Sequence, residues 1–112
     1  MRRHKYNAKK TIVDGITFDS KREAARYQEL KLLERAGEIR NLKLQPRYVL
    51  QDSFRKNGVT HRAITYVADF EYIDNQTNTV VVEDVKGKKT AVYNLKKKLF
   101  EKKYQNLSIR EI

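Results

Sequence analysis

The sequence lacks cysteine, has only two histidines and contains no long apolar run. Without cysteine the chain cannot form disulfides, thiolate metal sites or thiol nucleophiles. A zinc site built on His4 and His61 would need carboxylate ligands as well. The longest aliphatic run is Val80–Val82, far too short to span a membrane, and the basic start MRRHKYNAKK leads into no signal-like apolar segment. We therefore expect a cytoplasmic protein with no membrane partner.

Positively charged residues outnumber negatively charged ones. The 112 residues carry 25 Lys and Arg against 14 Asp and Glu, a formal net charge of +11. Such a surface favours a polyanionic partner, and nucleic acid fits better than anionic lipid because no long amphipathic helix dominates the chain. The length predicts one domain over residues 11–112, preceded by a flexible basic arm over residues 1–10.

The first elements have clear local signals. Asp14-Gly15 separates two short β-rich runs, which predicts a β-hairpin. A helix is predicted over 20–36, with Ser20 as its N-cap and Gly37 as its stop. Its predicted inner face repeats at helical spacing and consists of Ala24, Tyr27, Leu30 and Leu33.

The rest of the chain alternates strands with one more helix. Beyond the first helix, the chain is expected to be extended and interrupted at Pro46. Strands are predicted over 47–54, 61–73, 79–86 and 106–112. The second helix is predicted over 89–104, capped by Thr90, with its apolar stripe formed by Val92, Leu95 and Leu99. The order helix, three strands, helix, strand predicts a mixed α/β sheet flanked by helices.

Charged residues end the most apolar strand, in the stretch VVVEDVKGKKT. Asp84 and Lys86 are two residues apart, so a strand places both side chains on one face. The preceding strand is expected to place Ile64, Tyr66, Ala68, Phe70 and Tyr72 on one apolar face and Asp69 on the other. A hairpin between these strands would bring Asp69 opposite residues 83–85. The cluster is then either a Mg²⁺ site or a surface ion-pair ladder, and the spacing alone leaves both open.

Three other polar residues have two interpretations each. Glu23 follows Ser20 by three residues, which matches a capping box, but it can also add a third carboxylate to the cluster. Glu83 points away from Asp84 and is either a paired structural acid or a substitute ligand. Gln45 precedes Pro46 and either ends a turn or supports the cluster.

The ordered set of these residues resembles the PD-(D/E)XK nuclease superfamily, whose core order is helix, three strands, helix, strand. The stretches FDSKREAARY, LQPRYVL, YVADFEY and VVVEDVKGKKTAVYNLKKKLF are similar to a small phage-encoded family of uncharacterised proteins placed there. They are also similar to TnsA-like transposon end-cleaving nucleases and Holliday-junction resolvases. Two departures are Ala68 before Asp69, where the motif name has proline, and Asp84 where glutamate is more frequent.

The resemblance implies metal-dependent hydrolysis of a phosphodiester. Asp69, Asp84 and the backbone carbonyl of Val85 would bind Mg²⁺ or Mn²⁺, and Glu23 would ligate directly or through water. Lys86 would position the attacking water or stabilise negative charge, with Gln45 or Glu83 as a supporting or substitute residue.

The start of the second helix suits a DNA backbone, because free backbone N–H groups and the helix dipole favour phosphate there. The residues expected to contact DNA are Lys88, Lys89, Thr90, Tyr93, Lys96 and Lys97.

Three functions remain in view. The first is a Mg²⁺-dependent DNA endonuclease acting on branched, recombining or phage DNA, with a homodimer expected if both strands are cut. The second is a non-catalytic basic nucleic-acid-binding protein, and the third is an adaptor for an acidic protein. A pure DNA binder has no reason to gather acids near phosphate, so the carboxylates favour the nuclease.

Overall fold

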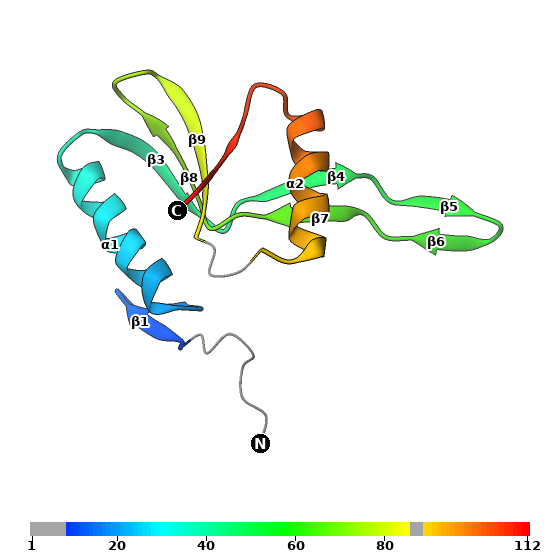
Figure 1. Cartoon of the computed structure of the whole chain (residues 1–112), viewed down its shortest axis with the longest axis horizontal. Helices are drawn as coiled ribbons and strands as arrows, with labels where there is room; N and C mark the ends of the chain where they lie inside the picture. The colour runs from blue at the N-terminus through cyan, green and yellow to red at the C-terminus, as the bar shows by residue number, and fades with distance from the viewer. Residues whose placement is uncertain (1–8, 86–88) are drawn as a thin grey trace.

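The computed structural model describes residues 9–85 and 89–112, which form a mixed α/β structure of ten strands and two helices (Figure 1). The chain starts with a hairpin of β1 (Thr11–Val13) and β2 (Ile16–Phe18). Asp14 and Gly15 form its two-residue turn with φ of 54° and 76°, which confirms the predicted hairpin.

Helix α1 (Lys21–Arg35) begins and ends where its caps predict. The Ser20 hydroxyl accepts a hydrogen bond from the backbone N–H of Glu23 at 3.1 Å. Gly37, with φ of 80°, follows the last turn in the left-handed conformation that a helix stop requires. The predicted inner face is confirmed at Ala24, Tyr27 and Leu30, which are buried.

Four strands form one sheet, in the spatial order β10 (Ile109–Glu111), β9 (Thr79–Asp84), β8 (Phe70–Asp74) and β3 (Ile39–Leu44). β3 and β9 both run antiparallel to β8. α2 (Ala91–Lys103) then leads to β10, which pairs parallel with β9. The coarse prediction of a mixed sheet with two helices is therefore confirmed.

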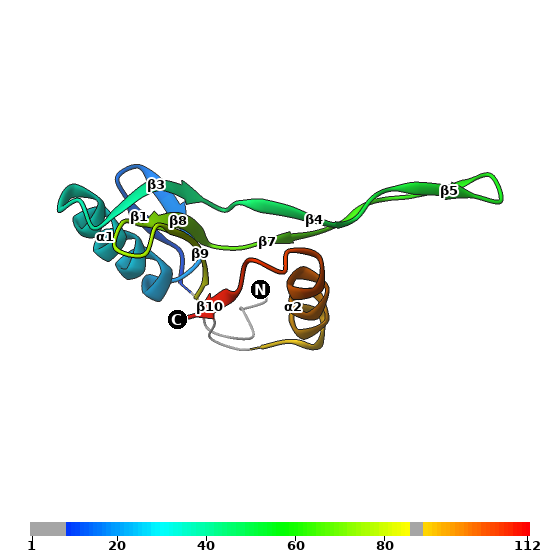
Figure 2. The ribbon, with the colours of Figure 1, turned by 90° about the horizontal axis from the view of Figure 1, so that it is seen from above.

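Two of the long predicted strands are broken into shorter ones and leave the sheet together. β4 (Arg47–Gln51) and β5 (Phe54–Lys56) continue β3, while β6 (Val59–His61) and β7 (Ile64–Val67) lead back into β8. β4 pairs with β7 and β5 pairs with β6, so these four strands form a two-stranded ribbon. Figure 2 shows this ribbon projecting from the helices and the central sheet.

The break between ribbon and sheet explains an error in the predicted strand over 61–73. That strand was expected to place Tyr66, Ala68, Phe70 and Tyr72 on one face. Instead Phe70 and Tyr72 pack in the core beneath α1, while Tyr66 and Ala68 pack in a second core with α2. Because the strand is interrupted at Ala68-Asp69, its period of two does not carry through, and successive halves face different helices.

The predicted inner face of α2 is also wrong. Val92 and Leu95 are 62% and 59% exposed, and Leu99 lies at the surface as well. The buried residues of α2 are Tyr93 and Phe100. Aromatic rings decide this face, because Phe100 packs edge-on against Tyr48 of the ribbon with ring centroids 5.0 Å apart.

The projecting ribbon makes the molecule long. The radius of gyration is 16.2 Å and the principal extents are 53 × 45 × 23 Å. A compact domain of this length would have a radius of about 13 Å. Within the described part of the chain, neither helix is long and apolar enough to cross a membrane.

Candidate active site

The point where ribbon and sheet meet gathers polar groups from separate segments. The backbone N–H of Gln45 donates to the Asp69 carbonyl at 2.9 Å, and the N–H of Asp69 donates to the Glu83 carbonyl at 3.1 Å. Gln45 has a positive φ of 51°, so the chain turns sharply just before Pro46. These bonds fix three chain segments side by side.

Asp69 lies where its spacing predicts, beside the end of β9. Its carboxylate accepts a hydrogen bond of 2.7 Å from the backbone N–H of Val85. The predicted approach of Asp69 to residues 83–85 is therefore confirmed. This contact is made with backbone, and the alternative ion-pair ladder runs through Lys86, which lies outside the described residues.

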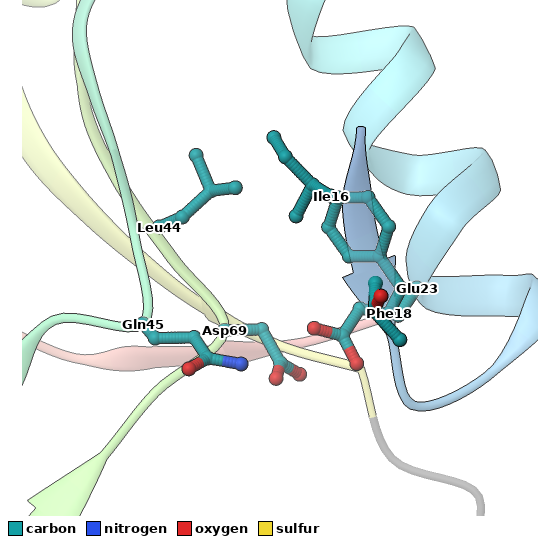
Figure 3. Close-up of a pocket in the computed structure, with 7 residues that line it drawn as sticks. Ile16, Phe18, Glu23, Leu44, Gln45 and Asp69 are labelled. Carbon is teal, nitrogen blue, oxygen red and sulfur yellow. The ribbon is translucent and has the colours of Figure 1, made fainter. Parts of the chain in front are cut away.

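Glu23 comes to the same place from the first turn of α1. It is 5% exposed and shares a pocket with Asp69 and Gln45. Figure 3 shows the carboxylates of Glu23 and Asp69 pointing toward one another, with the side chain of Gln45 beside them. The remaining lining residues of this pocket are Ile16, Thr17, Phe18 and Leu44. Ser20 caps the helix through the Glu23 backbone, while the Glu23 side chain faces this pocket.

Asp84 is the third carboxylate and the most enclosed of the three, at 2% exposed. The Tyr66 hydroxyl, which reaches it from the ribbon, donates a hydrogen bond to its Oδ2. Burial and this bond to Asp84 raise the pKa of Tyr66 far above its ordinary value. Tyr66 therefore stays a proton donor and holds Asp84 from the side opposite α1.

Burial disfavours the charged forms of Asp69 and Glu23. Burial raises the pKa of Asp69 to about 8, the negative charges of Asp84 and Glu23 add to the rise, and the Val85 N–H opposes it. Burial is also the main cause that raises the pKa of Glu23, with Asp19 next. The negative charge of Asp84 acts on both groups, and a nearby cation would relieve the cost of ionising Asp69 and Glu23.

The oxygen donors suit a hard cation, but they are not gathered as a finished metal site. Among the residues that the structure describes, no three acids or histidines form a group placed to hold a metal ion. Glu23 and Asp69 offer carboxylate oxygens in one pocket, the donor chemistry that Mg²⁺ and Mn²⁺ accept. The backbone N–H of Val85 and the hydroxyl of Tyr66 donate hydrogen bonds to carboxylate oxygens of Asp69 and Asp84. The Val85 carbonyl as a ligand stays a prediction.

Glu83 is a paired structural acid. It is fully buried on the α1 side of β9, where Arg26 donates to both of its carboxylate oxygens at 2.8 and 2.6 Å. Tyr72 donates a further hydrogen bond to it. Both of its carboxylate oxygens are therefore bonded within the chain, and its alternative role as a substitute for Asp84 stays a prediction. Sequence reasoning missed Arg26, although its position three residues after Glu23 places it on the adjoining helix surface.

Two of the predicted site residues, Lys86 and Lys88, lie outside the described residues. Thr90 caps α2, because its hydroxyl accepts from the Tyr93 N–H at 3.1 Å. Lys96 is half-buried on the same helix.

The other predicted DNA contacts surround Glu111, a residue that sequence reasoning missed. Tyr93 donates to its carboxylate at 2.6 Å, and Lys89 and Lys97 form ion pairs with it at 3.0 and 3.3 Å. These bonds lower the pKa of Glu111 to about 2. Because β10 pairs parallel with β9, Glu111 lies opposite Asp84. Only that pairing reveals its place, since one acid in a short terminal strand carries no signal.

A family model described as "Protein of unknown function (DUF1064)" matches residues 3–112. No curated protein and no solved structure matches the chain.

Proposed function

We propose that this chain, which belongs to the DUF1064 family, is a metal-dependent DNA endonuclease with a PD-(D/E)XK-like core. The observation that carries the proposal is that Glu23 and Asp69 share one pocket and that the negative charge of Asp84 acts on both. They come from α1, the β7–β8 break and the end of β9. Acids brought together from three segments, at least two of them buried, are stabilised in their ionised form by a cation.

The net charge supports a phosphate-bearing substrate. A protein of net charge +11 attracts DNA, whereas its carboxylates taken alone repel it. A bound cation removes this conflict, because it bridges carboxylate and phosphate oxygens. Clustered acids on a basic protein are thus explained by one function.

Each residue then has a role. Asp69 and Asp84 would hold Mg²⁺ or Mn²⁺, with Glu23 joining directly or through water. When bound, the cation would lower the pKa of a water molecule and offset charge on the phosphate. Lys86 would orient that water, and Gln45 would hold Asp69 in place through its backbone bond.

The order of elements agrees with this core. α1 is followed by three long extended segments, α2 and β10, with β10 beside β9. Asp84 is the last residue of the inner strand β9, and Asp69 comes directly before the first residue of the neighbouring strand β8. This is the placement that the superfamily resemblance implies for its acids.

The DNA backbone is expected near the start of α2, where Thr90 and Lys96 stand. Lys89 and Lys97 contact Glu111, so a phosphate would compete with that carboxylate for them. One chain offers one such site, and cutting both strands together would require a homodimer.

A second candidate is a nucleic-acid-binding protein with this architecture and no catalysis. It is favoured by the hydrogen bonds that Asp69 and Asp84 already have within the chain. In that case the acids would be structural and would need no cation.

A cleavage assay on labelled duplex, flap and four-way-junction DNA distinguishes the two. We expect wild type to cut with Mg²⁺ or Mn²⁺ but not with EDTA, and Asp84→Asn to lose at least about 100-fold in rate. Glu38→Gln removes the same charge from an exposed position outside the ribbon and the site, and it should cut normally. Circular dichroism would show that each variant is folded.

Metal binding supplies an independent readout. Titration with Mn²⁺, followed by electron paramagnetic resonance, should show binding that Asp84→Asn weakens and Glu38→Gln leaves intact. DNA binding without cutting and without Mn²⁺ uptake by wild type would favour the non-catalytic candidate.

A further inference from the structure

The distal half of the ribbon stands free of the rest of the molecule. We call residues 51–64 the outer ribbon; all fourteen are exposed. They span the end of β4, both strands of the β5–β6 hairpin and the start of β7. Figure 2 shows this segment extending beyond α2, which covers only the inner part of the ribbon.

Contacts within the outer ribbon give it a defined shape. Phe54 and His61 are opposite each other and stack with ring centroids 4.6 Å apart. On the next pair, Arg55 donates to the Thr60 hydroxyl at 2.8 Å. A two-stranded hairpin is only marginally stable by itself in water, so a partner surface would stabilise it.

The exposed charges are mostly positive. Arg55, Lys56 and Arg62 stand against one acid, Asp52, which gives the outer ribbon a formal charge of +2. Within the described part of the chain, none of these three cations forms an ion pair. Lysines and arginines on an edge also discourage aggregation, but unpaired cations on a projecting ribbon are at the same time free to meet phosphate.

The base of the ribbon is the candidate active site. Gln45 and Asp69 flank β4 and β7, and the bond from the Ala68 N–H to the Pro46 carbonyl at 3.1 Å closes the base. Ten residues separate Asp69 from Val59 at the tip. At about 3.3 Å per residue the tip lies about 33 Å from the site, close to one turn of B-DNA.

We propose that the outer ribbon is a duplex-DNA-binding arm that lies in the major groove about one helical turn from the bond that is cut. The proposal rests on the proposed function for the position of the cut. The major groove of B-DNA is wide enough for a two-stranded ribbon. The major groove of A-form RNA is too narrow for side chains to read, so duplex RNA should bind less tightly.

A charge-matched pair of variants tests this arm. The ribbon variant carries Arg55→Ala, Lys56→Ala and Arg62→Ala; the control variant carries Arg35→Ala, Lys98→Ala and Lys102→Ala on exposed helix positions. Both lose three charges from +11. Fluorescence anisotropy with labelled duplex DNA in EDTA should give binding at least about 10-fold weaker for the ribbon variant. Its salt dependence should also fall by about 2–3 in slope.

A shortened chain provides a second variant. Gln51 and Ile64 are opposite each other in the ribbon, so Asn-Gly can join them in place of residues 52–63. This variant should also bind duplex weakly. Wild type should lose affinity when the duplex on one side of the cut is shortened below about 10 base pairs, and its DNA complex should protect guanine N7 there from methylation.

The outcomes separate the arm from the nuclease. Equal losses of DNA affinity in the ribbon and control variants would show that only net charge matters, and they would overturn the proposal of a DNA-binding arm. Ribbon variants that bind as wild type, or a wild type that binds no DNA while its ribbon captures a second copy or an acidic protein, would overturn it too. Ribbon-dependent binding without metal-dependent cutting would keep the arm and reject the nuclease. If the ribbon variants cut DNA as well as wild type does, the nuclease would be kept and the DNA-binding arm rejected.

Discussion

Asp69 lies in an environment that disfavours its ionised form. Its carboxyl group lies beside Glu23 in a pocket and accepts a hydrogen bond from the Val85 backbone N–H. Burial raises its pKa to about 8 from 3.8, so ionising it in the metal-free protein is unfavourable at neutral pH. A residue that costs stability and stands beside other acids is typical of a functional site.

Asp69→Asn should therefore stabilise the protein in EDTA. A carboxyl group with a raised pKa destabilises the folded state as pH rises from about 4 to about 8, and asparagine removes that loss. Asparagine can still accept from the Val85 N–H. We expect no gain at pH 4 and a gain of at least about 1 kcal/mol at pH 8, or about 4–8 °C in Tm.

Thermal unfolding at several pH values measures this difference. Asp52→Asn, in the exposed ribbon, serves as the control and should change Tm little. A variant less stable than wild type at pH 8 would show that Asp69 has a structural role.

Among the elements, α2 shows how a helix can present its aliphatic side to solvent. Its exposed stripe is Val92, Leu95 and Leu99, while Tyr93 and Phe100 pack inward. The core beneath α2 is built from rings of the ribbon, and Phe100 contacts both Tyr48 and Tyr66. Aromatic rings bury more area than aliphatic side chains, so the rings determine which face of α2 packs against the core.

Leu95→Lys and Phe100→Ala should thus have opposite consequences. Leu95 is 59% exposed, so its replacement should change the free energy of unfolding by less than about 0.5 kcal/mol. Phe100 is fully buried, and its loss should cost about 3–5 kcal/mol. Urea unfolding compares the two directly. A large loss from Leu95→Lys would indicate that the stripe is covered, for example by a second copy.

For the whole molecule, the buried hydrophobic contacts lie in the two cores and not in the outer ribbon. Core residues under α1 and α2 are buried, whereas every residue of the outer ribbon is exposed. The outer ribbon therefore adds reach without adding to the hydrophobic core.

Replacing residues 52–63 by Asn-Gly should for this reason leave stability within about 1 kcal/mol of wild type. Tyr48→Ala is the matched change in the inner ribbon, where the ring packs against Phe100, and it should cost about 3–5 kcal/mol. Both are measured by urea unfolding. A shortened chain that fails to fold would mean that the outer ribbon is needed for the fold.

Local sequence signals predicted the elements well, because their causes are local. Asp14-Gly15, Ser20 and Gly37 each act within a few residues, so the hairpin and α1 lie where expected. The approach of Asp69 to the end of β9 also followed from sequence, because a short turn between paired strands fixes their register.

Local patterns in the sequence thus account for the order of the elements, the basic charge and the approach of Asp69 to the end of β9. The buried face of α2, the neutralisation of Glu83 by Arg26 and the position of Glu111 opposite Asp84 emerge only in the folded protein. So does the departure of the ribbon from the sheet at Gln45 and Asp69. The physical reason is that these outcomes depend on contacts between segments far apart in the chain, where packing overrides the local pattern.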